Sequence, residues 1–166
     1  MSNQTASCRC GQLTATATGT PVRISVCHCL NCQKRSGSAF AAQVRFPADQ
    51  VTVTGEAKTY TATGDNGAAH FHFCPNCGST VYYANDSQPD TIAIALGAFD
   101  DPYFVTPTVS VWEERQHEWV EIAGDVEPSE EARHCDPGHL SRGKQSSANK
   151  NWIAASPAAP RNDNRG

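Results

Sequence analysis

The stretch Val26-Cys27-His28-Cys29-Leu30-Asn31-Cys32-Gln33-Lys34-Arg35-Ser36-Gly37 contains three cysteines within six residues, followed directly by two cations. Cys-x-Cys spacing is too tight for a relaxed disulfide between the first two thiols. Thiolates are soft metal ligands, and one tetrahedral metal ion can hold all three. The stretch therefore supplies three ligands of a metal site. The fourth ligand decides whether that site is closed and structural or open and catalytic.

A second metal-ligand pattern, of the zinc-knuckle type, is Cys74-Pro75-Asn76-Cys77-Gly78. Two residues between the thiols let both sulfurs point at one ion, and the glycine tolerates the left-handed backbone that such a turn needs. A redox pair is the alternative for this spacing, but such pairs belong in a βαβ context. A strand-like segment, Thr80-Val81-Tyr82-Tyr83, follows instead, and this favours metal.

The knuckle needs two further ligands, and Cys8-Arg9-Cys10-Gly11 offers them. A closed four-thiolate site of this kind would be structural and would pin the N-terminal strand to the middle of the chain. Its ligands would be Cys8, Cys10, Cys74 and Cys77. Once these four cysteines are assigned to one site, three cysteines of the motifs remain. Three thiolates with one open position are the pattern of a catalytic zinc. This three-thiolate set is Cys27, Cys29 and Cys32.

The alternative is that a histidine closes the three-thiolate set, and the candidates are His28, His70 and His72. Lys34 and Arg35 follow the set directly, so they could bind a substrate carboxylate and keep the thiolates ionised. The other interpretation of both residues is a solvated pair of surface cations. The eighth cysteine, Cys135, is interpreted as a thiol outside both sets, with a further metal site as the alternative.

The chain has 166 residues and a formal net charge of −4, which suggest one domain large enough to bury a core. This acidic balance argues against a general nucleic-acid binder, which usually carries a basic face. The start of the chain lacks the pattern of a signal peptide, and the longest apolar stretch, Ile92 to Phe99, is too short to span a bilayer. We therefore expect a soluble, cytoplasmic protein whose reduced thiols bind metal. A secreted domain held by disulfides is the alternative.

Short alternating segments separated by turns predict an all-β domain, since no window carries a helical stripe. The expected strands are residues 12–18, 22–26, 39–46, 51–54, 58–61, 69–73, 80–83, 91–97, 109–112 and 119–122. Residues 51–54 and 58–61 are expected to pair as a hairpin. Helical turns are expected between Cys32 and Ser36, where Gly37 would stop the helix, and at 128–133.

The chain divides into a zinc domain, residues 1–125, and a flexible C-terminal tail, residues 126–166. From Asp136 onward the tail is mostly small and polar residues, which cannot bury enough apolar surface to offset the entropy of ordering. Residues 136–166 hold five Lys or Arg against two Asp or Glu. Without interleaved aromatic side chains this weak positive charge does not predict a nucleic-acid site.

In their order along the chain, the three cysteine motifs resemble the glutathione-dependent formaldehyde-activating enzyme family, also called the GFA or centromere-protein-V domain family. The motifs are Cys8-Arg9-Cys10-Gly11, the stretch from Cys27 to Gly37, and Phe73-Cys74-Pro75-Asn76-Cys77-Gly78-Ser79. The resemblance covers roughly residues 5–125. It implies an Mss4-like fold of several twisted antiparallel sheets held by zinc, with little helix.

The resemblance also implies two zinc ions per chain, a structural one on the four-cysteine set and a more labile one on Cys27, Cys29 and Cys32. The family's named reaction joins formaldehyde and glutathione to S-hydroxymethylglutathione and is classed as a carbon–sulfur lyase reaction. The three cysteines would then be catalytic, with Lys34 and Arg35 at the substrate. The alternative is a noncatalytic zinc module that binds glutathione or a protein partner. Neither nucleic acid nor a membrane is an expected partner.

Overall fold

A computed structural model of the chain describes residues 3–64 and 67–129. The strands are β1 (Gln4–Ser7), β2 (Thr14–Ala17), β3 (Arg23–Cys27), β4 (Ala41–Pro47), β5 (Val51–Thr54), β6 (Lys58–Gly64), β7 (Gly67–Phe73), β8 (Thr80–Asn85), β9 (Thr91–Ala95), β10 (Val109–Val111) and β11 (Glu127–Ser129). The helices are α1 (Leu30–Ser36) and three single 3-10 turns, η1 (Ala48–Gln50), η2 (Leu96–Ala98) and η3 (Glu113–Arg115). The expected all-β fold with little helix is confirmed.

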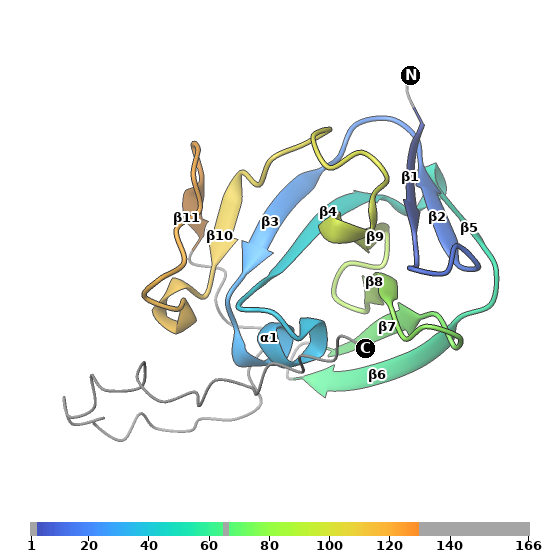
Figure 1. Ribbon diagram of the computed structural model, residues 1–166, viewed down its shortest axis with the longest axis horizontal. Coiled ribbons are helices and arrows are strands. Elements are labelled where there is room, and N and C mark those ends of the chain that lie inside the picture. The colour runs from blue at the N-terminus through green and yellow to red at the C-terminus, as the bar shows by residue number, and fades with distance from the viewer. Residues whose placement is uncertain (1–2, 65–66, 130–166) are drawn as a thin grey trace, which may run out of the picture.

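These strands form two sheets. The small sheet has the order β1-β2-β5, and the large sheet has the order β11-β10-β3-β4-β9-β8-β7-β6. Figure 1 shows the small sheet standing beside the large one, which twists so strongly that β6 runs across the direction of β3. Neighbouring strands are antiparallel, except that β10 pairs in parallel with both β3 and β11. The large sheet is therefore mixed rather than purely antiparallel.

The main core lies between the two sheets. On its small-sheet side, β1 and β2 contribute alanines, which have no side chain beyond Cβ and so allow the sheets to approach closely, and β5 adds the half-buried Val51 and Val53. Its large-sheet side consists of bulkier residues that fill the space. The buried members are Ala6, Cys8, Leu13, Ala15, Ala17, Val44, Phe46, Cys74, Val81, Ile94 and Phe99. Because side chains alternate along a strand, Val44 and Phe46 face this core while Gln43 and Arg45 face the other side of the sheet.

The hairpin predicted for residues 51–54 and 58–61 is wrong, although both segments are strands. β5 pairs with β2 in the small sheet, whereas β6 pairs with β7 in the large sheet. Gly55, with φ +98°, crosses from one sheet to the other so close to Gln12 that a Cβ atom would lie 1.9 Å from the Gln12 carbonyl oxygen. The Gln12 amide also bonds the backbone of Glu56, donating to its carbonyl at 2.9 Å and accepting from its N–H at 2.5 Å. This long-range anchor carries the chain away from β5 instead of turning it back.

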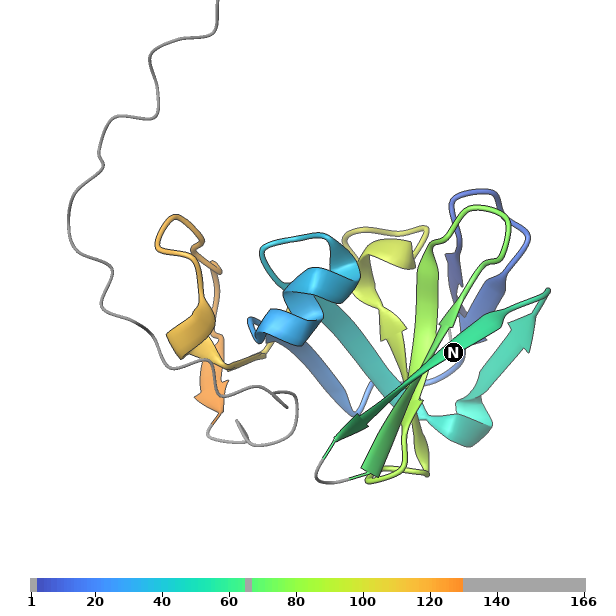
Figure 2. The same ribbon diagram turned by 90° about the horizontal axis from the view of Figure 1, so that it is seen from below.

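Helix α1 begins directly after the end of β3 and lies beside β4 (Figure 2). Cys29 is its N-cap, with Sγ accepting from the Cys32 N–H at 3.3 Å. Gly37 ends the helix in the left-handed conformation, with φ 63°, as the sequence predicted. The Ser36 hydroxyl donates back to the Cys32 carbonyl at 2.8 Å. The helix is short because its cap and its stop signal are only eight residues apart.

Two other expectations near the end of the described chain are wrong. Residues 119–122 form no strand, because a turn closes there with Val120 N–H donating to His117 O at 2.9 Å. Pro128 and Ser129, expected to begin a helical turn, belong to β11 instead. The rest of the predicted tail, residues 130–166, lies outside the described residues. No helix within the described ranges is long and apolar enough to cross a membrane.

Candidate metal centres

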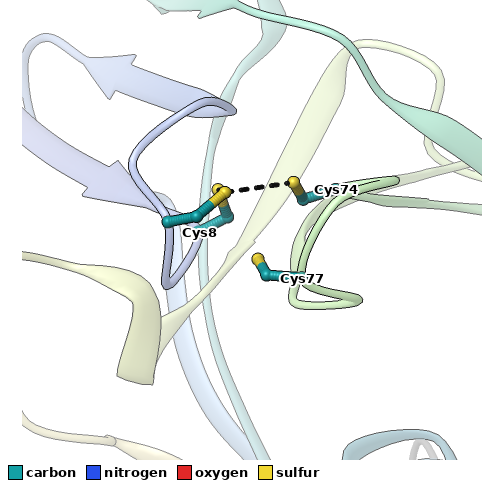
Figure 3. A group of neighbouring side chains, drawn as sticks. Cys8, Cys74 and Cys77 are labelled. Carbon is teal, nitrogen blue, oxygen red and sulfur yellow. Dashed lines mark hydrogen bonds between the residues drawn. The ribbon is translucent and has the colours of Figure 1, made fainter.

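The structure brings Cys8, Cys10, Cys74 and Cys77 together, with their four sulfurs all within 4.8 Å of one another. Figure 3 shows the side chains of Cys8, Cys74 and Cys77 converging from two loops. The Cys10 sulfur lies 3.5 Å from Cys8 Sγ and 3.6 Å from Cys74 Sγ. Tetrahedral zinc with Zn–S bonds of about 2.3 Å would separate its sulfurs by about 3.8 Å. This four-sulfur cluster therefore fits zinc in both donor type and spacing.

Both loops of the four-sulfur cluster have the same local geometry. Gly11 and Gly78, each one residue after the second cysteine of its pair, adopt φ of 78° and 74°. This left-handed conformation closes each turn, with Gly11 N–H donating to Cys8 O and Gly78 N–H donating to Cys74 O, both at 2.9 Å. The Cys-x-Cys-Gly and Cys-x-x-Cys-Gly motifs therefore specify their own turns.

Hydrogen bonds to the four sulfurs favour thiolates unequally. Hydrogen bonding with the Ser79 hydroxyl, whose oxygen lies 3.4 Å from Cys77 Sγ, and with the Ser79 backbone lowers the pKa of the Cys77 thiol to about 5. The Gln12 N–H also favours the Cys10 thiolate, but the Cys8 sulfur beside it, burial and the other sulfurs outweigh it and raise the pKa of Cys10 to about 11. Four thiolates this close repel one another, so full ionisation needs a cation among them.

The four-sulfur cluster joins the two sheets. Cys8 follows β1 of the small sheet, while Cys74 follows β7 of the large sheet, and both are buried. Gln12 adds a cross-link, donating to Cys74 Sγ at 3.3 Å, and Leu13 N–H donates to Cys8 Sγ at 3.2 Å. The cluster therefore connects elements that are distant in the sequence. The cluster is therefore placed to stabilise the fold.

The second group, called here the three-sulfur cluster, consists of Cys27, Cys29 and Cys32, whose sulfurs also lie within 4.8 Å of one another. Cys27 ends β3, Cys29 caps α1, and Cys32 lies in the first turn of that helix. The first two are buried and the third is half-buried. This cluster lies within one strand–helix junction and links no distant parts of the chain. Soft sulfur donors at this spacing fit zinc as well.

No histidine, aspartate or glutamate among the described residues joins the three sulfurs as a fourth ligand. His28 is fully buried with its ring edge toward Phe40, and burial is the main cause that lowers its pKa. His70 lies 2.9 Å from the Asp86 carboxylate, and His72 stacks on Tyr82. The histidine-closed alternative therefore finds no support in the described part of the chain. Cys135 lies outside it.

Gln33, to which the motif analysis assigned no role, connects α1 to a distant segment of the chain. Its amide donates to the His28 carbonyl at 2.7 Å and to the Arg115 carbonyl at 3.0 Å, and accepts from His117 Nε2 at 3.1 Å. These bonds fasten residues 112–117 beside the three-sulfur cluster. The motif spacing gave no signal for this role, because two of the three partners of Gln33 lie more than eighty residues away in the sequence.

Trp112 packs on the three-sulfur cluster together with Val109 and Val111. Its backbone is left-handed, with φ 61° and ψ 43°, and it is the one non-glycine residue with positive φ in the described ranges. A bulky residue in this conformation costs about 1–3 kcal/mol and persists only where its surroundings impose it. The Gln33 bonds and this strained residue together define one wall of the cluster.

The two cations after the three-sulfur cluster differ in environment. Lys34 is exposed on the surface of α1, whereas Arg35 is half-buried. The Arg35 guanidinium lies 4.7 Å from the centroid of the Phe71 ring and 5.7 Å from that of Tyr83. Lys34 and Arg35 were interpreted together in the sequence analysis, but they point in different directions from α1, and only Arg35 faces the sheet.

One comparison with known proteins, that with family models, agrees with the motifs. The model of the family described as "Glutathione-dependent formaldehyde-activating enzyme" matches residues 3–115. The comparison with curated proteins gives no match. Among solved structures, the chain is similar to a crystal structure of a Rhodobacter sphaeroides protein determined as a structural-genomics target, with 18% sequence identity and a TM-score of 0.49. That likeness covers 62% of this chain and 91% of the other, and the family assignment rests on the family model alone.

Proposed function

Because the chain belongs to the glutathione-dependent formaldehyde-activating enzyme family, we propose that it is a zinc-dependent carbon–sulfur lyase. It catalyses the reversible addition of a thiol to a small aldehyde, most simply glutathione to formaldehyde, giving S-hydroxymethylglutathione. The three-sulfur cluster is the reaction site with a labile zinc, and the four-sulfur cluster holds a structural zinc. One observation carries this assignment. The described residues supply four sulfurs to one cluster and only three to the other.

A closed four-sulfur shell leaves no position for a substrate, whereas three protein ligands leave one position open. Adduct formation joins the thiol sulfur to the carbonyl carbon. The carbonyl π electrons move to oxygen, which takes up the proton that the thiol loses. A bound zinc would lower the pKa of the thiol and polarise the aldehyde oxygen. Holding both reactants at one place supplies the proximity that the uncatalysed reaction lacks.

The residues around the three-sulfur cluster have separate tasks in this proposal. Trp112 shields one side of the cluster from water, and Gln33 holds that wall in place. Three thiolates with one divalent ion leave a net negative site, which is unfavourable for activating a carbonyl. The positive charge of the half-buried Arg35, three residues after Cys32 on α1, offsets that charge, whereas Lys34 is exposed to solvent. The seven described cysteines must stay reduced to act as ligands, which supports a cytoplasmic location.

The test is the rate of exchange between formaldehyde, glutathione and their adduct, measured by NMR at equilibrium. We expect the zinc-loaded chain to accelerate exchange, and Cys29→Ser to lower that acceleration at least about 100-fold by weakening the metal site. Serine can still cap α1, so the variant should remain folded. Unchanged exchange in folded Cys29→Ser would refute the proposal. If the wild-type chain binds glutathione without accelerating exchange, the noncatalytic zinc module is the better account.

A further inference from the structure

Two arginines from different elements meet on the helix side of the large sheet, next to the three-sulfur cluster. We propose that Arg35 of α1 and Arg45 of β4, held over the Tyr83 ring, bind a carboxylate of the thiol substrate. The site would thereby select acidic thiols over neutral ones. This inference rests on the proposed function, because it assigns a substrate class to the same reaction site.

A row of aromatic side chains forms the floor of this proposed subsite. The strand register places Tyr60, Phe71 and Tyr83 side by side on β6, β7 and β8. Their rings are in contact, with centroids 6.5 Å apart for Tyr60 and Phe71 and 5.1 Å apart for Phe71 and Tyr83. Through β9, the same row continues to Arg45, because Ala93 pairs with both Tyr83 and Arg45. Ala93 is small, so the Arg45 side chain can reach over it to Tyr83.

The two guanidinium groups converge on one ring. Arg35 Cζ lies 5.7 Å and Arg45 Cζ lies 5.9 Å from the Tyr83 centroid, and Arg35 also covers Phe71 at 4.7 Å. A guanidinium over an aromatic face gains cation–π attraction and is held in one place. Its N–H donors lie in the guanidinium plane, and the ring contact does not consume them. The aromatic row therefore positions both cations and leaves donors for an anion.

Neither arginine is neutralised by an acidic partner within residues 3–64 and 67–129. Within the described ranges, Arg45 donates to neutral groups, namely the Gln88 amide oxygen, the Thr91 hydroxyl at 3.3 Å and the Tyr83 hydroxyl at 3.5 Å. The buried Nε of Arg35 has no hydrogen-bond partner in the described part of the chain. Two half-buried cations this close to one ring repel each other, and a carboxylate between them would relieve that repulsion.

The helix fixes where this subsite lies relative to the three-sulfur cluster. Cys32 and Arg35 are three residues apart, so they share one face of α1 and are separated by about 4.5 Å along its axis. A ligand with its sulfur at the cluster and a carboxylate several bonds away can reach Arg35. Lys34 is one residue earlier, points elsewhere and is exposed. Arg35 and Arg45 therefore lie at the proposed subsite, whereas Lys34 does not.

The test uses S-methylglutathione, which keeps both carboxylates but has no thiol to lose a proton, and its diethyl ester, which has neither charge. Affinity is measured by calorimetry with the zinc-loaded full-length chain. We expect the acid to bind at least about tenfold more tightly than the ester. Arg35→Met and Arg45→Met should each weaken binding of the acid about tenfold and leave binding of the ester unchanged. Lys34→Met is the matched control, since it removes one exposed charge from the same helix, and its effect should stay below about threefold.

Equal affinity for acid and ester in the wild-type chain, or no binding of the acid, would overturn the inference without any mutation. A loss in Lys34→Met as large as in Arg35→Met would also overturn it, because a diffuse charge effect would then explain the result. The proposed function fails separately. It fails if no thiol exchanges with formaldehyde faster in the presence of the chain, even while the acid still binds through the two arginines.

Discussion

The two cysteine clusters use the same ligand chemistry in opposite structural settings. The four-sulfur cluster joins two loops that are more than sixty residues apart and belong to different sheets. The three-sulfur cluster occupies one strand–helix junction that is six residues long. A metal ion at the four-sulfur cluster therefore closes a loop of more than sixty residues, which removes much conformational freedom from the unfolded chain. A metal ion at the three-sulfur cluster closes a loop of only six residues. The difference suggests that the fold depends on the first cluster and the chemistry on the second.

Cys74→Ser should have the largest effect. Cys74 is fully buried, and losing one of four ligands releases a zinc whose binding free energy is about 10–16 kcal/mol in small zinc domains. That exceeds or equals the usual stability of a domain, about 5–15 kcal/mol. We expect the variant to lose its cooperative thermal transition, followed by far-UV circular dichroism in the presence of zinc. A wild-type transition midpoint would contradict the structural role of this cluster.

Cys29→Ser should have a smaller effect on stability and a large effect on metal content. The serine preserves the cap of α1, so the folded state remains and the chain loses one zinc out of two. The free energy of unfolding should fall by about 1–2 kcal/mol, as for a typical point mutation, measured by urea denaturation alongside zinc analysis. Loss of both zinc ions together would show that the clusters are coupled rather than independent. Cys135→Ser is the companion variant, and we expect it to keep both zinc ions.

Gln33→Ala should loosen residues 112–117 beside the three-sulfur cluster without removing any of its three sulfur ligands. The variant leaves the carbonyls of His28 and Arg115 without the Gln33 donor, at a cost of about 1–3 kcal/mol. Zinc should be lost from the three-sulfur cluster at lower chelator concentration than in wild type, while the four-sulfur cluster is unaffected. Lys34→Ala, next to it on the same helix and exposed, is the control and should match wild type. Equal chelator sensitivity of Gln33→Ala and wild type would show that the wall does not support the site.

Asp86→Asn should have the smallest effect, and it probes a contact that belongs to neither cluster. The hydrogen bond with His70, followed by the Ala68 N–H, lowers the pKa of the Asp86 carboxyl below its ordinary value of 3.8. This contribution to stability is present above pH 3.8 and is lost as the pH falls through the lower pKa of the folded state. Thermal midpoints should therefore fall less steeply below about pH 4 in Asp86→Asn than in wild type. Equal steepness of the Asp86→Asn and wild-type curves below about pH 4 would contradict this prediction.

Features encoded by neighbouring residues were predictable from the sequence. Gly37 ends α1, and Gly11 and Gly78 close the cysteine turns, because each acts within a few residues. The start of α1 was not predicted, because the helix begins at Leu30 with Cys29 as its cap rather than after Cys32. The grouping of the cysteines into four and three followed from motif spacing and counting. The Cys74-x-x-Cys77 knuckle could therefore be assigned a partner motif before the structure was known.

Features that depend on contacts between distant residues were not predictable. Gly55 looks like an ordinary hairpin turn, and only the Gln12 carbonyl packed against it explains why the chain crosses between the sheets. Nothing in the sequence around Arg45 indicates that it lies beside Arg35. That position depends on the order of β4, β9, β8 and β7 in the large sheet. Trp119 was assigned to a strand from its apolar neighbours, but it lies in an irregular segment and is exposed. Alternation alone does not reveal which neighbour a strand will pair with.

The most direct test of the difference between the clusters is zinc stoichiometry per chain, measured before and after addition of glutathione, with circular dichroism recorded on the same samples. The account predicts two zinc ions per chain that fall toward one, while the β-sheet spectrum and the thermal transition are retained. Two zinc ions that no thiol removes, or a spectrum that collapses as the first zinc leaves, would contradict it.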